Sequence, residues 1–72
     1  MENRTPRVQK ILAGNIKSAR EKLGYSQQAL AERADLSPGH MNDIEQGRKW
    51  ISAESFERIA NALGLEPFML LL

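Results

Sequence analysis

The 72-residue sequence contains no cysteine and a single histidine. Without cysteine the chain forms no disulfide and offers no thiolate to a metal ion, and one histidine alone does not make a catalytic zinc site. We therefore expect no metal and no cofactor. The fold must then be held together by the packing of its side chains.

Long hydrophobic runs are also absent. The longest apolar run is the last five residues, 68–72, whereas a helix needs about 20 apolar residues to cross a bilayer. The first ten residues lack the apolar centre of a signal peptide. We therefore expect a soluble, cytoplasmic protein without a membrane partner, and the length fits one small domain over residues 1–72.

Charge is unevenly distributed along the chain, although the net charge is only +1. Residues 1–24 carry a net charge of +4, and residues 25–47 carry −3. A basic segment of this kind fits a surface that binds phosphate, and it fits an ordinary solvated helix face equally well. Charge alone leaves both readings open.

The hydrophobic pattern predicts helices throughout. Apolar residues recur every three or four positions, and no stretch alternates as a strand does. Serine or threonine precedes each of the first four expected helices as a cap, and glycine ends most of them. The expected caps are Thr5, Ser26, Ser37 and Ser52, and a short fifth helix is expected from Glu66-Pro67. The buried face of the first helix is expected to consist of Val8, Ile11, Leu12, Ile16, Ala19 and Leu23.

The second and third expected helices are short and are joined by a turn of three or four residues. Two such helices dock only if a small side chain lies where they cross, and Ala31 meets that need. Asp35 occupies the sharp part of the turn and tolerates a left-handed backbone. The outer face of the third helix stays polar. This pattern is typical of a helix-turn-helix, whose second helix enters the DNA major groove.

The segments "SQQALAERADLSPGHMNDIEQG" and "FERIANALGL" resemble the lambda-repressor-like helix-turn-helix domains of the Cro/C1 or Xre type. The resemblance covers residues 9–70 and keeps several elements in a fixed register. It implies an all-α bundle of five helices. It also implies a transcriptional regulator that binds double-stranded DNA sequence-specifically, as a homodimer on a two-fold operator.

The resemblance also implies roles for single positions. The expected base contacts are Pro38, Gly39, His40, Asn42 and Asp43, and the expected phosphate contacts are Gln27, Ser37, Arg48 and Lys49. The first two base-contact positions lack long polar side chains, so readout shifts to the other three. Asn42 suits adenine, Asp43 suits the amino group of cytosine, and His40 suits a base or a phosphate. The alternative is that these residues form an ordinary solvated helix face.

Two further expectations concern structure. Arg20 and Glu45 match a buried ion pair that ties the first helix to the third in some relatives, and we expect it to stabilise the fold rather than to bind DNA. Trp50 departs from the family pattern. We expect it to cap the core between the third and fourth helices, with a subunit contact or a sugar-phosphate contact as alternatives.

The five apolar residues at the C-terminus cannot all face one core. We expect Phe68, Met69, Leu71 and Leu72 to form the interface of a symmetric dimer. The alternative is that the chain is the N-terminal part of a longer protein whose next segment covers this patch.

Two other functional classes compete with DNA binding. An enzyme is not expected, because Ser37, His40 and Asp43 share one helix, whereas catalytic groups converge from different elements. The stronger competitor is an antitoxin or adaptor on the same fold, whose partner is a protein such as a toxin or polymerase.

Overall fold

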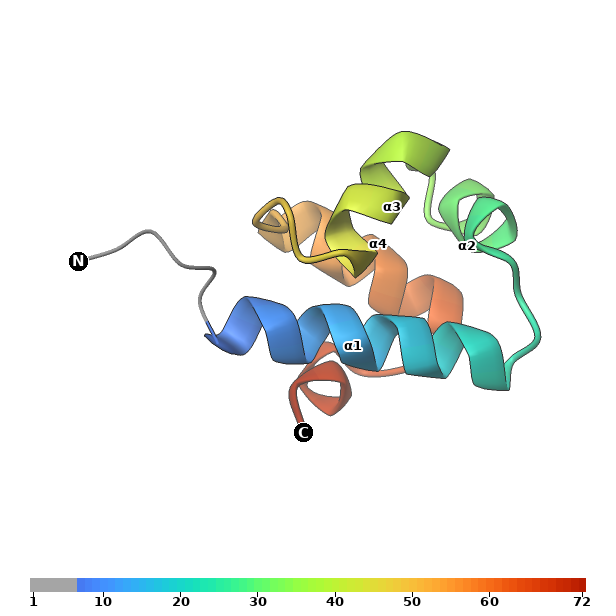
Figure 1. Ribbon diagram of the computed structural model, residues 1–72. Coiled ribbons are helices and arrows are strands. Elements are labelled where there is room, and N and C mark those ends of the chain that lie inside the picture. Colours follow the sequence, from blue (N-terminus) through green and yellow to red (C-terminus); the bar gives the residue numbers. More distant parts are fainter. Residues whose placement is uncertain (1–6) are drawn as a thin grey trace.

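The computed structural model describes residues 7–72, which form helices connected by short loops (Figure 1). The elements are α1 (Arg7–Lys22), α2 (Gln27–Arg33), α3 (Pro38–Glu45), α4 (Ala53–Leu63) and the 3-10 helix η1 (Pro67–Leu71). No strand occurs in this part of the chain, as the sequence predicts. The expected start of the first helix at Thr5-Pro6 lies outside the described residues.

The fifth element corrects the prediction of five α-helices. It contains only five residues and has 3-10 geometry. Five residues that begin with a proline leave almost no room for the hydrogen bonds of an α-helix, which span four residues, and 3-10 turns are common in such short pieces. The fold is therefore all-helical, with four α-helices and one 3-10 helix in residues 7–72.

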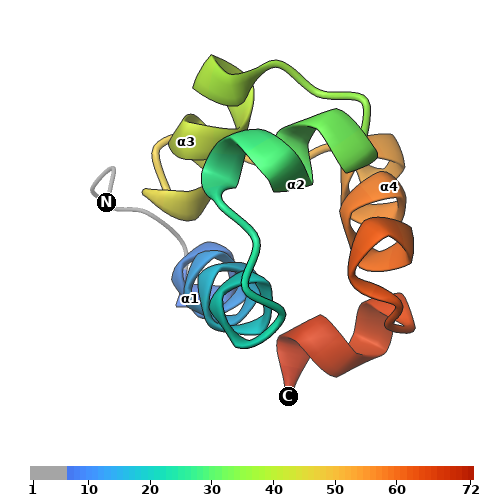
Figure 2. The same ribbon diagram turned by 90° about the vertical axis from the view of Figure 1, so that its right-hand side faces the viewer.

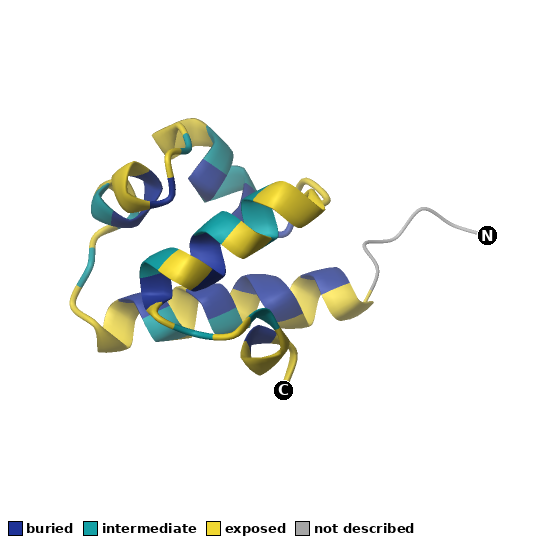
Figure 3. Cartoon of the chain, turned by 180° about the vertical axis from the view of Figure 1, so that it is seen from behind, coloured by how far each residue is buried: buried dark blue, intermediate teal, exposed yellow. Residues whose placement is uncertain are grey.

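The helices surround a single core (Figure 2). α2 packs against both α3 and α4, and α1 closes the other side through contacts with α3, α4 and η1. Each element contributes one large side chain that is almost completely buried, and these side chains are Ile16, Leu30, Met41, Ile59 and Leu70. The buried residues of each helix therefore face a common centre, while the outer faces are exposed (Figure 3).

Serine caps begin three of the helices. The hydroxyls of Ser26, Ser37 and Ser52 each accept a hydrogen bond from the backbone N–H three residues later, at 3.0–3.1 Å. Each bond satisfies an N–H group that has no partner within its helix. The helix starts predicted at these serines are confirmed.

The turn between α2 and α3 also has the predicted geometry. Asp35 has a φ of +58°, the left-handed conformation that aspartate tolerates better than most residues. The backbone N–H of Leu36 donates to the carbonyl oxygen of Ala31 at 2.8 Å and closes the turn. Ala31 is completely buried, as expected of a small residue where two helices approach closely.

The buried face of α1 differs from the predicted one. Val8, Ile11 and Leu23 are exposed, whereas Gln9 and Ala13 are buried. The Gln9 side chain is accommodated inside because its Nε2 donates to the carbonyl oxygen of Gly47 at 2.8 Å. Hydrophobic periodicity does not reveal a polar residue whose hydrogen bonds are satisfied by a distant segment.

The prediction for Trp50 is wrong. The residue is 60% exposed, and the neighbouring Ile51, 8% exposed, joins the core instead. Trp50 therefore does not cap the core between α3 and α4.

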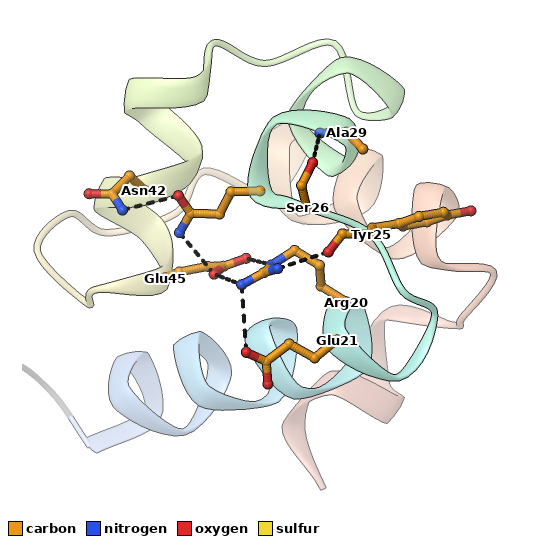
Figure 4. Close-up of polar contacts among 8 residues, drawn as sticks. Arg20, Glu21, Tyr25, Ser26, Ala29, Asn42 and Glu45 are labelled. Atoms are coloured by element: carbon orange, nitrogen blue, oxygen red, sulfur yellow. Dashed lines mark hydrogen bonds and ion pairs between the residues drawn. The ribbon is translucent and has the colours of Figure 1, made fainter.

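Arg20 of α1 and Glu45 of α3 form a buried, bidentate ion pair (Figure 4). Arg20 Nε lies 2.8 Å from Glu45 Oε2, and Nη2 lies 3.1 Å from Oε1. The Nη1 atom donates to the carbonyl oxygen of Tyr25 at 2.9 Å. The hydrogen bonds with the Glu45 carboxylate raise the pKa of Arg20 above its usual value, so the guanidinium stays charged inside the protein.

We predict that breaking this pair is far costlier than replacing it. Arg20→Met or Glu45→Met alone leaves a buried charge unpaired and should lower the free energy of unfolding by about 3–5 kcal/mol. The double variant should be clearly more stable than either single variant, because no charge is left in the interior. Urea denaturation followed by far-UV circular dichroism measures all three.

The matched control is the exposed pair of Arg58 and Glu54, whose Nη2 and Oε2 atoms are 2.7 Å apart. Glu54→Gln should cost under about 1 kcal/mol, because exposed pairs contribute little. Strictly additive effects of the Arg20 and Glu45 substitutions would contradict the interpretation.

Candidate nucleic-acid interface

The outer face of α3 is the candidate interface. Met41, Ile44 and Glu45 of this helix face the interior, whereas the opposite side carries polar or small residues. These are Pro38, Gly39, Asn42, Asp43 and Gln46, all exposed or partly exposed. In Figure 1 the α3 ribbon lies at the upper edge of the molecule, and no other described element lies above it.

The N-terminus of α3 is open to an approaching anion. Pro38 and Gly39 are exposed, and the Ser37 hydroxyl already accepts from the N–H of His40 at 3.1 Å. A Cβ atom added to Gly39 would meet nothing within 4 Å. Packing inside the protein therefore does not require glycine here. Its absent side chain leaves the backbone accessible at the end of the helix, where the dipole favours phosphate.

A continuous chain of hydrogen bonds joins the buried ion pair to this surface (Figure 4). Glu45 Oε1 accepts from Gln27 Nε2 at 3.0 Å, and Gln27 Oε1 accepts from Asn42 Nδ2 at 3.1 Å. Asn42 Oδ1 then accepts from Arg48 Nη2 at 2.8 Å. The side chains of α2, α3 and the loop after α3 are thus held in one arrangement that begins at Arg20.

This chain bears on two expected contacts. Gln27 keeps one amide hydrogen for a phosphate after bonding Glu45, so its expected role as a phosphate contact is compatible with the geometry. Asn42 is engaged through both its amide nitrogen and its oxygen. Pairing with adenine would have to use the second lone pair of its oxygen and the second hydrogen of its amide nitrogen. Both contacts stay predictions.

Asp43 lies beside both cations of the following loop. Arg48 Nη2 is 3.0 Å from Asp43 Oδ1, and Lys49 Nζ is 3.9 Å from Oδ2. The side chains of Arg48 and Lys49 remain 56% and 62% exposed. The three residues together carry a net charge of +1, so Asp43 does not make this surface repel phosphate. Hydrophobic periodicity does not reveal this pairing, because the contact crosses the end of α3.

His40 differs from the other expected base contacts. Its Nε2 atom is buried and has no hydrogen-bond partner within the described part of the chain. That nitrogen would reach a base or a phosphate only after the ring has turned.

The described residues contain no group of three or more His, Asp or Glu side chains placed to hold a metal ion. Across residues 7–72, none of the helices is both long enough and apolar enough to span a membrane.

Comparison with known proteins is consistent with this geometry. A sequence model described as "Helix-turn-helix" matches residues 16–70. Control protein C.BamHI of Bacillus amyloliquefaciens is 39% identical over 46 residues, which are 64% of this chain and 57% of that protein. A hypothetical transcription factor of Neisseria meningitidis serogroup B is 34% identical over 62 residues, covering 86% of this chain and 58% of that protein. The chain thus spans less than three fifths of the length of these two relatives.

Solved structures are similar over nearly the whole chain. The clp gene regulator ClgR of Corynebacterium glutamicum superposes with a TM-score of 0.87 at 31% identity, covering 94% of this chain and 72% of that one. The restriction-modification controller protein C.AhdI of Aeromonas hydrophila gives 0.84 at 26% identity, covering 86% of this chain and 94% of that one. With its α2–turn–α3 geometry and a family match over residues 16–70, the chain belongs to the helix-turn-helix family of the Xre and Cro/C1 type.

Proposed function

We propose that this chain is a transcriptional regulator that binds double-stranded DNA sequence-specifically. The observation that carries the proposal is the placement of α3. Its buried residues Met41, Ile44 and Glu45 pack against the protein, while its polar side is exposed or partly exposed. An α-helix with its side chains is about 10–12 Å wide and fits the major groove, which is about 12 Å wide. The names of the relatives, a control protein, a gene regulator and a controller protein, support regulation of transcription.

In this proposal the open N-terminus of α3 approaches the DNA first. The exposed backbone at Pro38 and Gly39 lies near the base edges and the sugar-phosphate backbone. Gln27 and Ser37 contact phosphates at the start of their helices, and Lys49 contacts a phosphate from the loop after α3. Phosphate contacts set the register on the duplex, and side chains on the outer face of α3 select the sequence.

We expect micromolar binding to a random duplex at low salt, measured by fluorescence anisotropy. Each phosphate that is neutralised adds about 0.9 to the slope of log affinity against log salt concentration. Lys49→Ala should therefore flatten the slope by about 0.9. The control is Lys22→Ala, because Lys22 lines the groove between α1 and η1 and lies away from α3.

Absence of binding at about 50 mM salt would contradict the proposal, because the non-specific affinity for DNA rises as the salt concentration falls. That outcome would favour the competing function, an antitoxin or adaptor whose α3 surface meets a protein.

We also propose that the protein acts as a homodimer through the C-terminal segment. In this segment Leu70 is buried, whereas the residues on either side of it are 43–85% exposed. The exposed residues are Phe68, Met69, Leu71 and Leu72. Asn15 Nδ2 donates to the carbonyl oxygens of Leu70 at 2.7 Å and Leu72 at 3.3 Å, which holds the segment against α1. An apolar surface of this kind favours association with a partner.

The position of this apolar surface suits a dimer that binds DNA. In Figure 1, α3 lies above α1 and η1 lies below it, so contact through η1 leaves both α3 helices free. A two-fold axis would present them to half-sites about 34 Å apart.

We predict that Phe68→Lys combined with Leu71→Lys converts a dimer into a monomer in sedimentation equilibrium at micromolar concentration. Both side chains are exposed, so the fold should survive while the charges repel across the two-fold axis. The control is Trp50→Ser, which should stay dimeric because Trp50 lies in the loop after α3. A soluble, monomeric wild-type protein would contradict the proposed dimer.

A further inference from the structure

The Arg48 side chain lies back against α3, although the residue itself follows the end of that helix. Its Nε donates to Asp43 Oδ1 at 3.1 Å, and its Nη2 donates to Asn42 Oδ1 at 2.8 Å. Its backbone N–H donates to the carbonyl oxygen of Asp43 at 2.9 Å. Backbone and guanidinium are therefore both fixed relative to the outer face of α3.

These contacts leave one nitrogen of the guanidinium without a hydrogen bond within residues 7–72. Arginine has five N–H donors in a plane. Nε donates to Asp43, and Nη2 donates to Asn42 and also lies 3.0 Å from Asp43 Oδ1. Nη1 has no such contact, and the side chain is 56% exposed. An N–H donor in the plane of the guanidinium matches an acceptor on the edge of guanine, O6 or N7.

The hydrogen bonds that hold Arg48 continue into the core. Asn42 is bonded to Gln27, Gln27 to Glu45, and Glu45 to the buried Arg20. A phosphate contact needs little more than a positive charge within reach. A directed hydrogen bond to a base depends on orientation, and an arginine that is fixed through Nε and Nη2 meets that requirement before DNA arrives.

The neighbouring charge also lowers the attraction of Arg48 for a phosphate. The Asp43 carboxylate lies 3.0 Å from Arg48 Nη2 and offsets the charge of the guanidinium. The edge of guanine carries no net charge, so a hydrogen bond to guanine depends less on that charge.

We propose that Arg48 determines specificity by donating from Nη1 to O6 or N7 of a guanine, with Asp43 and Asn42 as positioning residues. The assignment rests on the DNA-binding function proposed above. It replaces the phosphate contact expected of Arg48, the adenine contact expected of Asn42 and the cytosine contact expected of Asp43. None of the three residues lies in the core, so each can be substituted without opening it.

The test is selection of bound duplexes from a random pool, followed by anisotropy on the selected site and its single-base variants. Wild type should require guanine at one position of the site. Arg48→Ala and Arg48→Lys should both reduce that preference by about 5- to 100-fold, because lysine keeps the charge but lacks the guanidinium that Asp43 and Asn42 hold in one orientation. Asp43→Ala should weaken the preference at the same position. The control Lys49→Ala should lower affinity for all sequences and leave the preference intact.

Three results would overturn the assignment of Arg48 without contradicting DNA binding. They are a guanine preference that survives in Arg48→Lys, an equal loss for every sequence in Arg48→Ala, and a general gain in affinity without a change of preference in Asp43→Ala. The last result would mean that Asp43 weakens a phosphate contact made by Arg48. Failure of the folded wild-type protein to bind any duplex would instead overturn DNA binding itself, and this assignment with it.

Discussion

The ion pair of Arg20 and Glu45 is the interaction on which the rest of this structure depends. α3 contains eight residues, fewer than the about 12–15 that an isolated helix needs to be marginally stable in water. Its orientation must therefore come from tertiary contacts. Two side-chain hydrogen bonds, at 2.8 and 3.1 Å, fix the last turn of α3 to α1. The pair is tolerable inside the protein because the Tyr25 carbonyl and the Gln27 amide satisfy its remaining hydrogen-bonding capacity.

The same pair links the stability of the fold to the organisation of its surface. Glu45 orders Gln27, and the hydrogen bonds continue through Asn42 to Arg48. The polar side chains of α3 are therefore arranged before any ligand binds, which lowers the entropic cost of binding. The C-terminal apolar segment lies on the other side of α1 from α3, so the proposed dimer contact and the proposed DNA contact involve separate surfaces.

Much of the fold follows from local signals in the sequence. Serine caps mark three helix starts, and Asp35 marks the turn, because each depends on backbone geometry within a few residues. The errors concern interactions between distant segments. Gln9 is buried by a bond to Gly47, 38 residues away, and Ile51 takes the core position expected for Trp50. At the candidate site the sequence identified most of the residues on the outer face of α3, but it did not show that Nε2 of His40 is buried. It did not reveal that Asn42, Asp43 and Arg48 bond to one another, since no periodic pattern relates a helix to the loop beyond its end.

The most direct measurement is a titration of isotope-labelled protein with duplex DNA, followed through backbone amide chemical shifts. If the anchored α3 presents its outer face to DNA, the changes should concentrate on residues 37–49 and on Gln27, while the amides of η1 stay unchanged. Changes confined to η1 and the adjoining side of α1, with α3 unaffected, would contradict the account.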